Sequence, residues 1–274
     1  MKRSQLSAEF VGEAGQRIFV IAHHPEQFSG NCILVCPPFA EEMNKSRRMM
    51  TELAQHLIKK GKGLVIPDLF GTGDSEGDFA EASVTRWMDD LVQTEKWVEE
   101  KGWRVESILG IRFGCLLAAY YAESYAKFNP RLVFWQPVLD GRKALDQFLR
   151  IRVAASLMAD TKETVSGLKA KIANGVTVEI AGYAISNRMA KEMEVVNLDN
   201  AINKRSSEFH WIEVVRDLNA AVSLPVEKKV EQIRENRKVN FVSVLGDPFW
   251  ISNEISINHE LIYRTVNLLT GAVS

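Results

Sequence analysis

This 274-residue chain lacks the features that mark secreted, membrane-spanning or disulfide-rich proteins. Its three cysteines are Cys32, Cys36 and Cys115, and an odd, small number argues against a disulfide framework and for a reducing compartment. No run of about 18 apolar residues occurs, so no transmembrane helix is expected. The polar residues 1–13 do not resemble a signal peptide. We therefore expect a soluble, cytoplasmic protein.

The chain also has no excess of charge of either sign. Its 34 Lys and Arg residues nearly balance 35 Asp and Glu residues, for a formal net charge of −1. This gives no electrostatic argument for a nucleic-acid partner or an anionic membrane. Only five histidines occur, and no group of Cys, His or Asp has the spacing of metal ligands. We expect no metal, no cofactor and no nucleic acid.

Short apolar runs of strand type alternate with amphipathic helical stretches along most of the chain. Strands are predicted at residues 17–24, 32–36, 63–67, 107–109, 131–137, 177–181, 209–215 and 240–245. Helices are predicted at residues 47–60, 85–101, 116–126, 187–195, 225–238 and 257–269, and residues 39–48 are predicted as a polar loop leading into the first helix. Helices between strands form βαβ units and a mostly parallel sheet, so we predict an α/β fold.

One segment departs from this alternation. Residues 141–174 are rich in Arg, Lys, Ala and Leu and carry no strand signal. We predict a helical cap inserted at residues 141–176, over the edge of a core made of residues 1–140 and 177–274. An exposed apolar face on this cap would allow a homodimer.

The most informative stretch follows the strand that begins at Ser107. The strand enters a turn bounded by Gly110 and Gly114, and a helix-forming run follows directly. A strand, a sharp turn between small residues and a helix form the layout of a nucleophile elbow, whose middle position is normally serine. Here the middle position is Arg112, which stays protonated and presents only donors, so it cannot be the nucleophile.

The order of these elements resembles the α/β-hydrolase fold, and the chain resembles the exosortase A system-associated hydrolases. The resemblance rests on the stretches Pro37–Arg48, Asp68–Gly77, Leu109–Gly114, Trp135–Arg142, Ala181–Ser186 and Gly246–Trp250. It implies an eight-stranded, mostly parallel sheet with helices on both faces. It also implies a hydrolase, of ester or acyl-transfer type, linked to exopolysaccharide and PEP-CTERM protein-sorting systems.

In this fold a base and a carboxylate complete the catalytic triad. The base histidine normally follows the last strand, but Gly246–Trp250 contains no histidine, and His259 is expected on the surface of the closing helix. Asp217 follows the penultimate strand, where the triad carboxylate normally lies. The triad is therefore degenerate in two of its three members.

Other candidates come from the carboxyl ends of the strands, where open α/β sheets bind ligands. Phe39 and Phe113 would supply the N–H groups of an oxyanion hole. The candidate catalytic residues are Arg112, Asp217, Asp247 and Glu41, and the candidate substrate-binding residues are Phe39, Glu42, Phe113, Trp250 and Cys36. We expect all of these residues except Cys36 to line a pocket between cap and sheet. Cys36 is either a displaced nucleophile or, more simply, a buried structural thiol.

Two functions remain open. The first is a hydrolase or acyl transferase with an unusual nucleophile, or with a water activated by Glu41, Glu42 or Asp247. The second is an inactive hydrolase-like protein whose Arg112 clamps an anionic small molecule or a protein partner. Either way, burial of a guanidinium requires a partner, so we predict a carboxylate of Glu41, Glu42, Asp217 or Asp247 beside Arg112.

Overall fold

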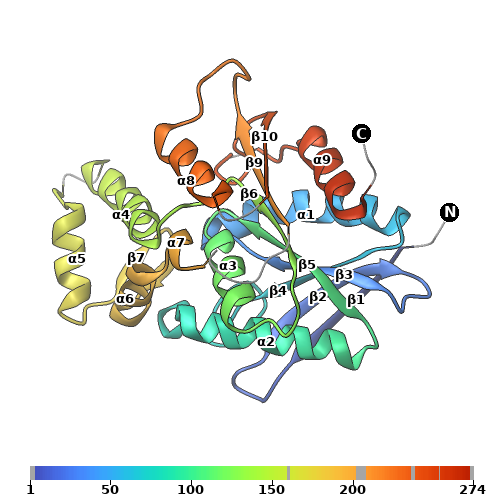
Figure 1. The fold of residues 1–274 in the computed structure, drawn as a ribbon. Coiled ribbons are helices and arrows are strands. Elements are labelled where there is room, and N and C mark those ends of the chain that lie inside the picture. The colour runs from blue at the N-terminus through green and yellow to red at the C-terminus, as the bar shows by residue number, and fades with distance from the viewer. Residues whose placement is uncertain (1–3, 159–160, 202–207, 236–237, 253, 272–274) are drawn as a thin grey trace.

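The computed structural model describes residues 4–158, 161–201, 208–235, 238–252 and 254–271. An eight-stranded sheet has the order β1-β2-β4-β3-β5-β6-β9-β10, with helices on both faces (Figure 1). The strands are β1 (Ser4–Val11), β2 (Ile18–Pro25), β3 (Asn31–Cys36), β4 (Gly63–Asp68), β5 (Arg104–Ile111), β6 (Arg131–Trp135), β9 (Phe209–Val215) and β10 (Val239–Leu245). The predicted α/β fold is confirmed.

Six strands of this sheet run parallel to one another: β4, β3, β5, β6, β9 and β10. The antiparallel hairpin of β1 and β2 joins them through β2, which pairs with β4 in the antiparallel sense. Central strands are largely buried because helices cover both of their faces; in β3 every residue after Asn31 is buried. Strand β1 was missed by the sequence analysis. It lies at the sheet edge with most side chains exposed or half-buried, so its sequence has no continuous apolar run.

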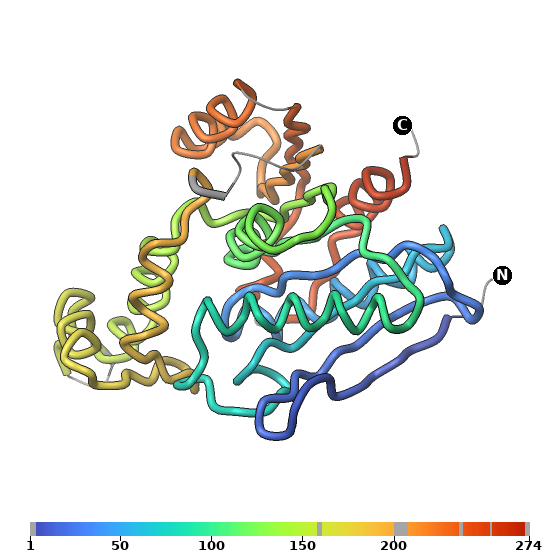
Figure 2. Tube along the Cα trace, turned by 60° about the horizontal axis from the view of Figure 1, so that its bottom comes forward, coloured from blue at the N-terminus to red at the C-terminus, as the bar shows by residue number. Residues whose placement is uncertain are grey.

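Helices cover the sheet in two groups, each with its own buried cluster. Helices α1 (Glu41–Lys59) and α9 (His259–Thr270) pack on one face, through side chains such as Met50, Leu53 and Ile262. Helices α2 (Val84–Glu100), α3 (Gly114–Ser124) and α8 (Leu224–Arg234) belong to the cluster on the other face. Figure 2 shows α2, in teal to green, as a long helix lying along the strands.

Helix α1 begins six residues before its predicted start at Arg47. Its first turn contains Glu41 and Glu42, in a stretch predicted to be a loop. Carboxylates are favourable in a first turn because the helix macrodipole places partial positive charge there. The early start is important for function, since it fixes both carboxylates on a rigid element instead of a loop.

The segment between β6 and β9 forms a separate group at one end of the molecule (Figures 1 and 2). It contains α4 (Gly141–Met158), α5 (Val165–Ala173), the hairpin of β7 (Val178–Ile180) and β8 (Tyr183–Ile185), α6 (Asn187–Val195) and α7 (Leu198–Ala201). Helix α4 contacts α5, α6 and β7. The division of the chain at 141 and 176 stays a prediction.

A 3₁₀ turn, η1 (Phe79–Glu81), contacts β8. Within the described ranges, no helix is long and apolar enough to cross a bilayer.

Candidate functional site

A sharp turn joins β5 to α3 at the carboxyl edge of the sheet. Strand β5 ends at Ile111, α3 begins at Gly114, and Arg112 between them has a φ of 55°. This left-handed conformation is strained for any residue with a Cβ. The surroundings enforce it: the Arg112 N–H donates to the carbonyl of Trp135 (2.9 Å), and its own carbonyl accepts from the N–H of Val138 (3.3 Å).

Two glycines allow the helix to return close to the strand. A Cβ on Gly110 would lie 2.6 Å from the Cα of Cys115, and a Cβ on Gly114 would lie 2.1 Å from the carbonyl oxygen of Cys36. No side chain fits at either distance. The glycine spacing that predicted the turn therefore reflects two backbone contacts, and these contacts position Arg112 at the tip of the turn.

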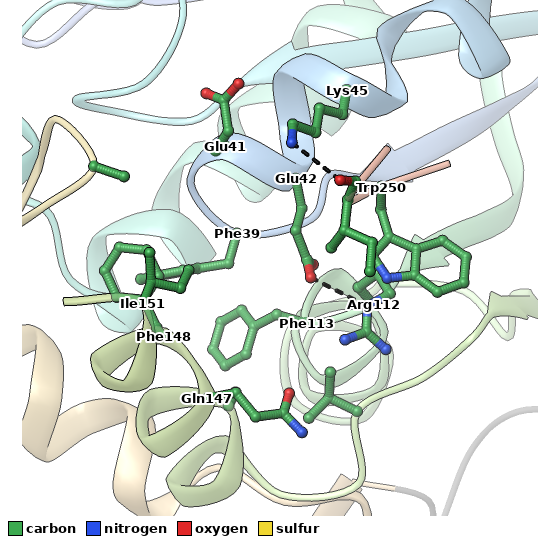
Figure 3. Close-up of a pocket in the computed structure, with 14 residues that line it drawn as sticks. Phe39, Glu41, Glu42, Lys45, Arg112, Phe113, Gln147, Phe148, Ile151 and Trp250 are labelled. Carbon is green, nitrogen blue, oxygen red and sulfur yellow. Dashed lines mark hydrogen bonds and ion pairs between the residues drawn. The ribbon is translucent and has the colours of Figure 1, made fainter. Parts of the chain in front are cut away.

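The Arg112 side chain is half-buried and contacts three groups, of which Figure 3 shows Glu42 and Trp250. Its Nε donates to Oε1 of Glu42 at 3.3 Å, and its Nη1 donates to the carbonyl oxygen of Gln136 at 3.2 Å. The guanidinium carbon lies 5.0 Å from the ring centroid of Trp250, a cation–π distance. The predicted carboxylate partner of Arg112 is confirmed as Glu42 from the first turn of α1.

Glu42 occupies a largely desolvated position beside this cation. Its side chain is 26% exposed and that of Arg112 is 16% exposed. Burial raises the pKa of Glu42 above its usual value, while the charge and hydrogen bond of Arg112, and more weakly the charge of Lys45, lower it. The ion pair thus offsets part of the cost of burying the charged carboxylate.

A buried network lies behind Arg112 at the ends of β6 and β9. Gln136, itself at a φ of 46°, accepts at Oε1 from the N–H of Val214 (2.6 Å) and donates from Nε2 to Glu213 (2.8 Å). Glu213 also accepts from the indole N–H of Trp211 at 2.6 Å. Burial raises the pKa of Glu213. These bonds fix the Gln136 carbonyl that receives Arg112.

Arg112 and Glu42 border a pocket of about 480 Å³ between the sheet and α4. Its lining consists of Phe39, Glu41, Glu42, Lys45, Arg112, Phe113, Val138, Ala144, Gln147, Phe148, Ile151, Ala181, Trp250 and Ile251. Aromatic rings pack edge to face along it, with the ring centroid of Phe39 5.5 Å from that of Phe113 and 5.1 Å from that of Phe148. Figure 3 shows Phe39, Phe148 and Ile151 on one side, with Arg112 and Trp250 on the other. The pocket is therefore apolar, with charged groups mainly at one wall.

Six of the predicted site residues line this pocket: Phe39, Glu41, Glu42, Arg112, Phe113 and Trp250. Two predicted placements are wrong. Asp217 is exposed after β9 and accepts from the N–H of Asn219, and Asp247 is exposed and pairs with Arg216 at 3.2 Å. Both residues follow the ends of the last two strands, where the chain turns outward into solvent.

Cys36 and His259 also lie away from the pocket. Cys36 is fully buried at the end of β3, and burial strongly raises the pKa of its thiol, so a thiolate nucleophile is disfavoured there. His259 is exposed in the first turn of α9. Among the described residues, no Ser, Thr, Cys or His side chain lines the pocket, and no three Cys, His, Asp or Glu side chains gather as metal ligands would.

Several lining residues were missed by the sequence analysis. Gln147, Phe148 and Ile151 come from α4, which was predicted as a helix without an assigned face. Gln136, behind the pocket, directly follows β6, so the end of that strand was the available signal. Lys45, Val138 and Ala181 lie in stretches that carry the family resemblance, but the resemblance implied no role for them.

No protein-family model and no curated protein matches this chain. Solved structures match it at low identity. Est1E from Butyrivibrio proteoclasticus, solved with ferulic acid bound, has a TM-score of 0.69 at 13% identity, over 96% of this chain and 97% of that chain. The α/β hydrolase GrgF from Penicillium sp. sh18 has a TM-score of 0.61 at 16% identity, over 98% of each chain.

Carboxyl esterase 2 from Tuber melanosporum has a TM-score of 0.57 at 12% identity, over 98% of this chain and 84% of that chain. At such identities a likeness speaks for the fold and not for the chemistry. One architecture accounts for the strand order, for the strand–turn–helix at Arg112 and for the similarity to these solved structures. The chain has the α/β-hydrolase fold.

Proposed function

We propose that this protein binds an amphipathic, anionic small molecule in the pocket at Arg112 and does not cleave it. The observation that carries this proposal is the content of the pocket. At the position of the nucleophile it has Arg112, and among the described residues it has no Ser, Thr, Cys or His side chain. Acyl transfer by a triad needs a nucleophilic side chain and a histidine base, and the described lining has no Ser, Thr, Cys or His side chain to supply them.

The chemistry of the lining indicates the ligand class. A guanidinium binds carboxylates through pairs of N–H donors, and Nη2 of Arg112 has no hydrogen-bond partner among the described residues. The remaining lining is mostly aromatic and aliphatic. A flat apolar body with one carboxylate fits this combination. The ferulic acid bound by Est1E belongs to this chemical class, which supports the choice.

The test is calorimetric titration with cinnamate and with cinnamamide, its uncharged isostere. Cinnamate should bind, and cinnamamide should bind at least tenfold more weakly. Arg112→Gln should weaken cinnamate binding by about 10- to 100-fold, because a hydrogen bond to a charged group contributes about 1.5–3 kcal/mol. Arg48→Ala is the matched control, since Arg48 lies on α1 outside this pocket and pairs with Glu52. Equal binding of the acid and the amide would contradict the proposal.

A second candidate is hydrolysis of an ester or acyl group by a water that Glu42 activates. The raised pKa of Glu42 favours this role, because a carboxylate becomes a stronger base as its pKa rises. Its pairing with Arg112 opposes the role. A panel of activated acyl esters tests it with Glu42→Gln, Glu41→Ala, Arg112→Ala and Cys36→Ala. Turnover lost in Glu42→Gln and kept in Cys36→Ala would establish the enzyme, and turnover at background in the unmodified protein would exclude it for these esters.

We also propose, from the sequence resemblance alone, that the protein works in exopolysaccharide or exosortase-dependent protein-sorting metabolism. Deletion of its gene should then change the amount or composition of secreted polysaccharide, measured against a complemented strain. An unchanged polysaccharide and unchanged sorting would remove this context while leaving the binding proposal intact.

A further inference from the structure

Building on the proposed binding function, we infer that the pocket takes up its anion together with one proton, which Glu42 accepts when the anion replaces it at Arg112. Two features of the site matter: the edge of the Arg112 guanidinium that an incoming carboxylate can occupy, and the fate of the Glu42 carboxylate that is bound there in the free protein. The contacts around Arg112 determine both.

A guanidinium offers a carboxylate two edges for paired hydrogen bonds, one formed by Nε and a terminal nitrogen, the other by the two terminal nitrogens. In this protein each edge is already occupied at one nitrogen. Glu42 accepts from Nε at 3.3 Å, and the carbonyl of Gln136 accepts from Nη1 at 3.2 Å. Because Nε has a single hydrogen and Nη1 has two, an anion that binds the Nε edge with two hydrogen bonds must displace Glu42.

The Gln136 carbonyl is the fixed acceptor. The N–H of Gln136 donates to the carbonyl of Ile212 at 2.8 Å, and its side chain is tied to Val214 and Glu213. Glu42 contributes a side-chain carboxylate through a single long hydrogen bond, and its Cα is fixed in the first turn of α1. Rotation of this side chain frees the Nε edge without moving any backbone. An anion that binds at this edge therefore replaces Glu42.

A displaced Glu42 would keep Lys45 as the one cation besides Arg112 in the described lining, and Lys45 lowers its pKa less than Arg112 does. The charged groups in the lining besides Arg112 are Glu41 and Lys45, both on α1, and Nζ of Lys45 donates to the carbonyl of Ile251 at 3.2 Å. Across the pocket the nearest polar residue of α4 is Gln147, which is uncharged. Burial already raises the pKa of Glu42, and Arg112 is the main group that opposes this shift. With an anion on Arg112, the carboxylate takes a proton from solvent.

The coupling has a defined sign. Glu42 has a lower pKa in the free protein than in the loaded protein, so between these two pKa values binding takes up one proton. By linkage the affinity then falls by up to tenfold for each unit of rising pH. At lower pH Glu42 is protonated in both states, and at higher pH in neither, so the affinity levels off at both ends.

The experiment is calorimetric titration of the unmodified protein with cinnamate from pH 5 to 9, in buffers that differ in ionisation enthalpy. The dependence of the heat on the buffer counts the protons, and we expect uptake approaching one proton at some pH in this range. Glu42→Gln should bind cinnamate with no proton uptake and with an affinity that does not change with pH. Glu52→Gln, which changes a carboxylate of the same helix outside the pocket, should keep the uptake.

Each outcome separates this inference from the function on which it rests. Absence of cinnamate binding overturns the proposed function. Binding of cinnamate without proton uptake at any pH overturns the inference and leaves the proposed function intact. Proton uptake that persists in Glu42→Gln has the same meaning, because the proton acceptor would then be another group. Cinnamamide, which has no charge to displace Glu42, should bind without proton uptake; uptake with this ligand would also contradict the inference, and this arm needs no variant.

Discussion

Arg112 combines two properties that are costly separately. Its backbone has a φ of 55°, which favours glycine, and its charged side chain is half-buried. Glu42, the Gln136 carbonyl and the Trp250 ring offset the cost of burying the charge. The backbone strain has no such offset at the residue itself, because the contacts of β5 and α3 impose it. Such strain is common at functional sites.

The strain can be measured with a matched pair of variants. Arg112→Gly and Arg112→Ala both remove the guanidinium, and they differ only in whether a Cβ must occupy the left-handed conformation. We expect Arg112→Gly to be more stable than Arg112→Ala by about 1 kcal/mol, the usual cost of this conformation for a residue with a Cβ. Urea unfolding of both variants gives the difference, and equal stabilities would show that the turn relaxes when the arginine is removed.

At the scale of elements, the contact of α3 with β3 and β5 determines the geometry of the turn. Gly114 is the first residue of α3, and at this position the close contact with β3 outweighs the helix propensity of the residue. Alanine is preferred in helices by up to about 1 kcal/mol, but its Cβ would collide with the carbonyl of Cys36. Backbone atoms cannot move aside as a flexible side chain can.

We therefore expect Gly114→Ala to destabilise the protein by about 1–3 kcal/mol or more, the range for overpacked sites. Gly102→Ala is the control, because Gly102 has a φ of 73° but open space around its Cα. It should cost about 1 kcal/mol from backbone conformation alone. Chemical denaturation of both variants checks the order, and a smaller loss for Gly114→Ala would mean that α3 can shift away from β3.

The first turn of α1 is the other element that forms the site. Because the helix begins at Glu41, the Glu42 side chain has a fixed origin from which to reach Arg112, 70 positions further along the chain. This arrangement is what makes Glu42, and not Glu41, the partner: Glu41 is exposed, next to Asn44 and Tyr183.

For the whole molecule, the buried Asp90 in α2 links stability to pH. It accepts from the N–H of Phe70 at 2.8 Å and from Nε of Arg86 at 3.1 Å, and burial raises its pKa from 3.8 to about 6. Between these values the folded protein keeps a proton that the unfolded chain has lost. Stability therefore falls as pH rises from 4 to 6, by up to about 3 kcal/mol from this group.

Asp90→Asn removes this titration. Asparagine makes poorer hydrogen bonds here, so the variant should be less stable at pH 4, and its deficit relative to the unmodified protein should shrink as pH rises to 6. Urea unfolding at pH 4, 5 and 6 measures the deficit. A deficit that stays constant over this range would show that Asp90 has an ordinary pKa in the folded protein.

A cytoplasmic location and a homodimer through the cap remain predictions. The apolar residues Ile151 and Leu157 of α4 are 50% and 66% exposed, as a homodimer that buries this helix would require. Measurement of the molar mass of the protein in solution tests the predicted homodimer.

The sequence by itself determined the architecture and the unusual residue at its centre. Alternating apolar strands and amphipathic helices were sufficient for the α/β fold, because burial of strands on both faces leaves a local pattern. The glycines around Arg112 likewise marked the turn, since only glycine permits those backbone contacts. The edge strand β1 left no such pattern and was missed.

Only the tertiary structure decided which side chains share the site. Glu42, Asp217 and Asp247 were equivalent candidates along the chain, and the direction in which each element leaves the sheet separated them: α1 directs Glu42 to Arg112, whereas the chain after β9 and β10 turns Asp217 and Asp247 into solvent. The pocket wall from α4 was also unpredictable. Contacts between residues distant in sequence depend on packing, which no local pattern records.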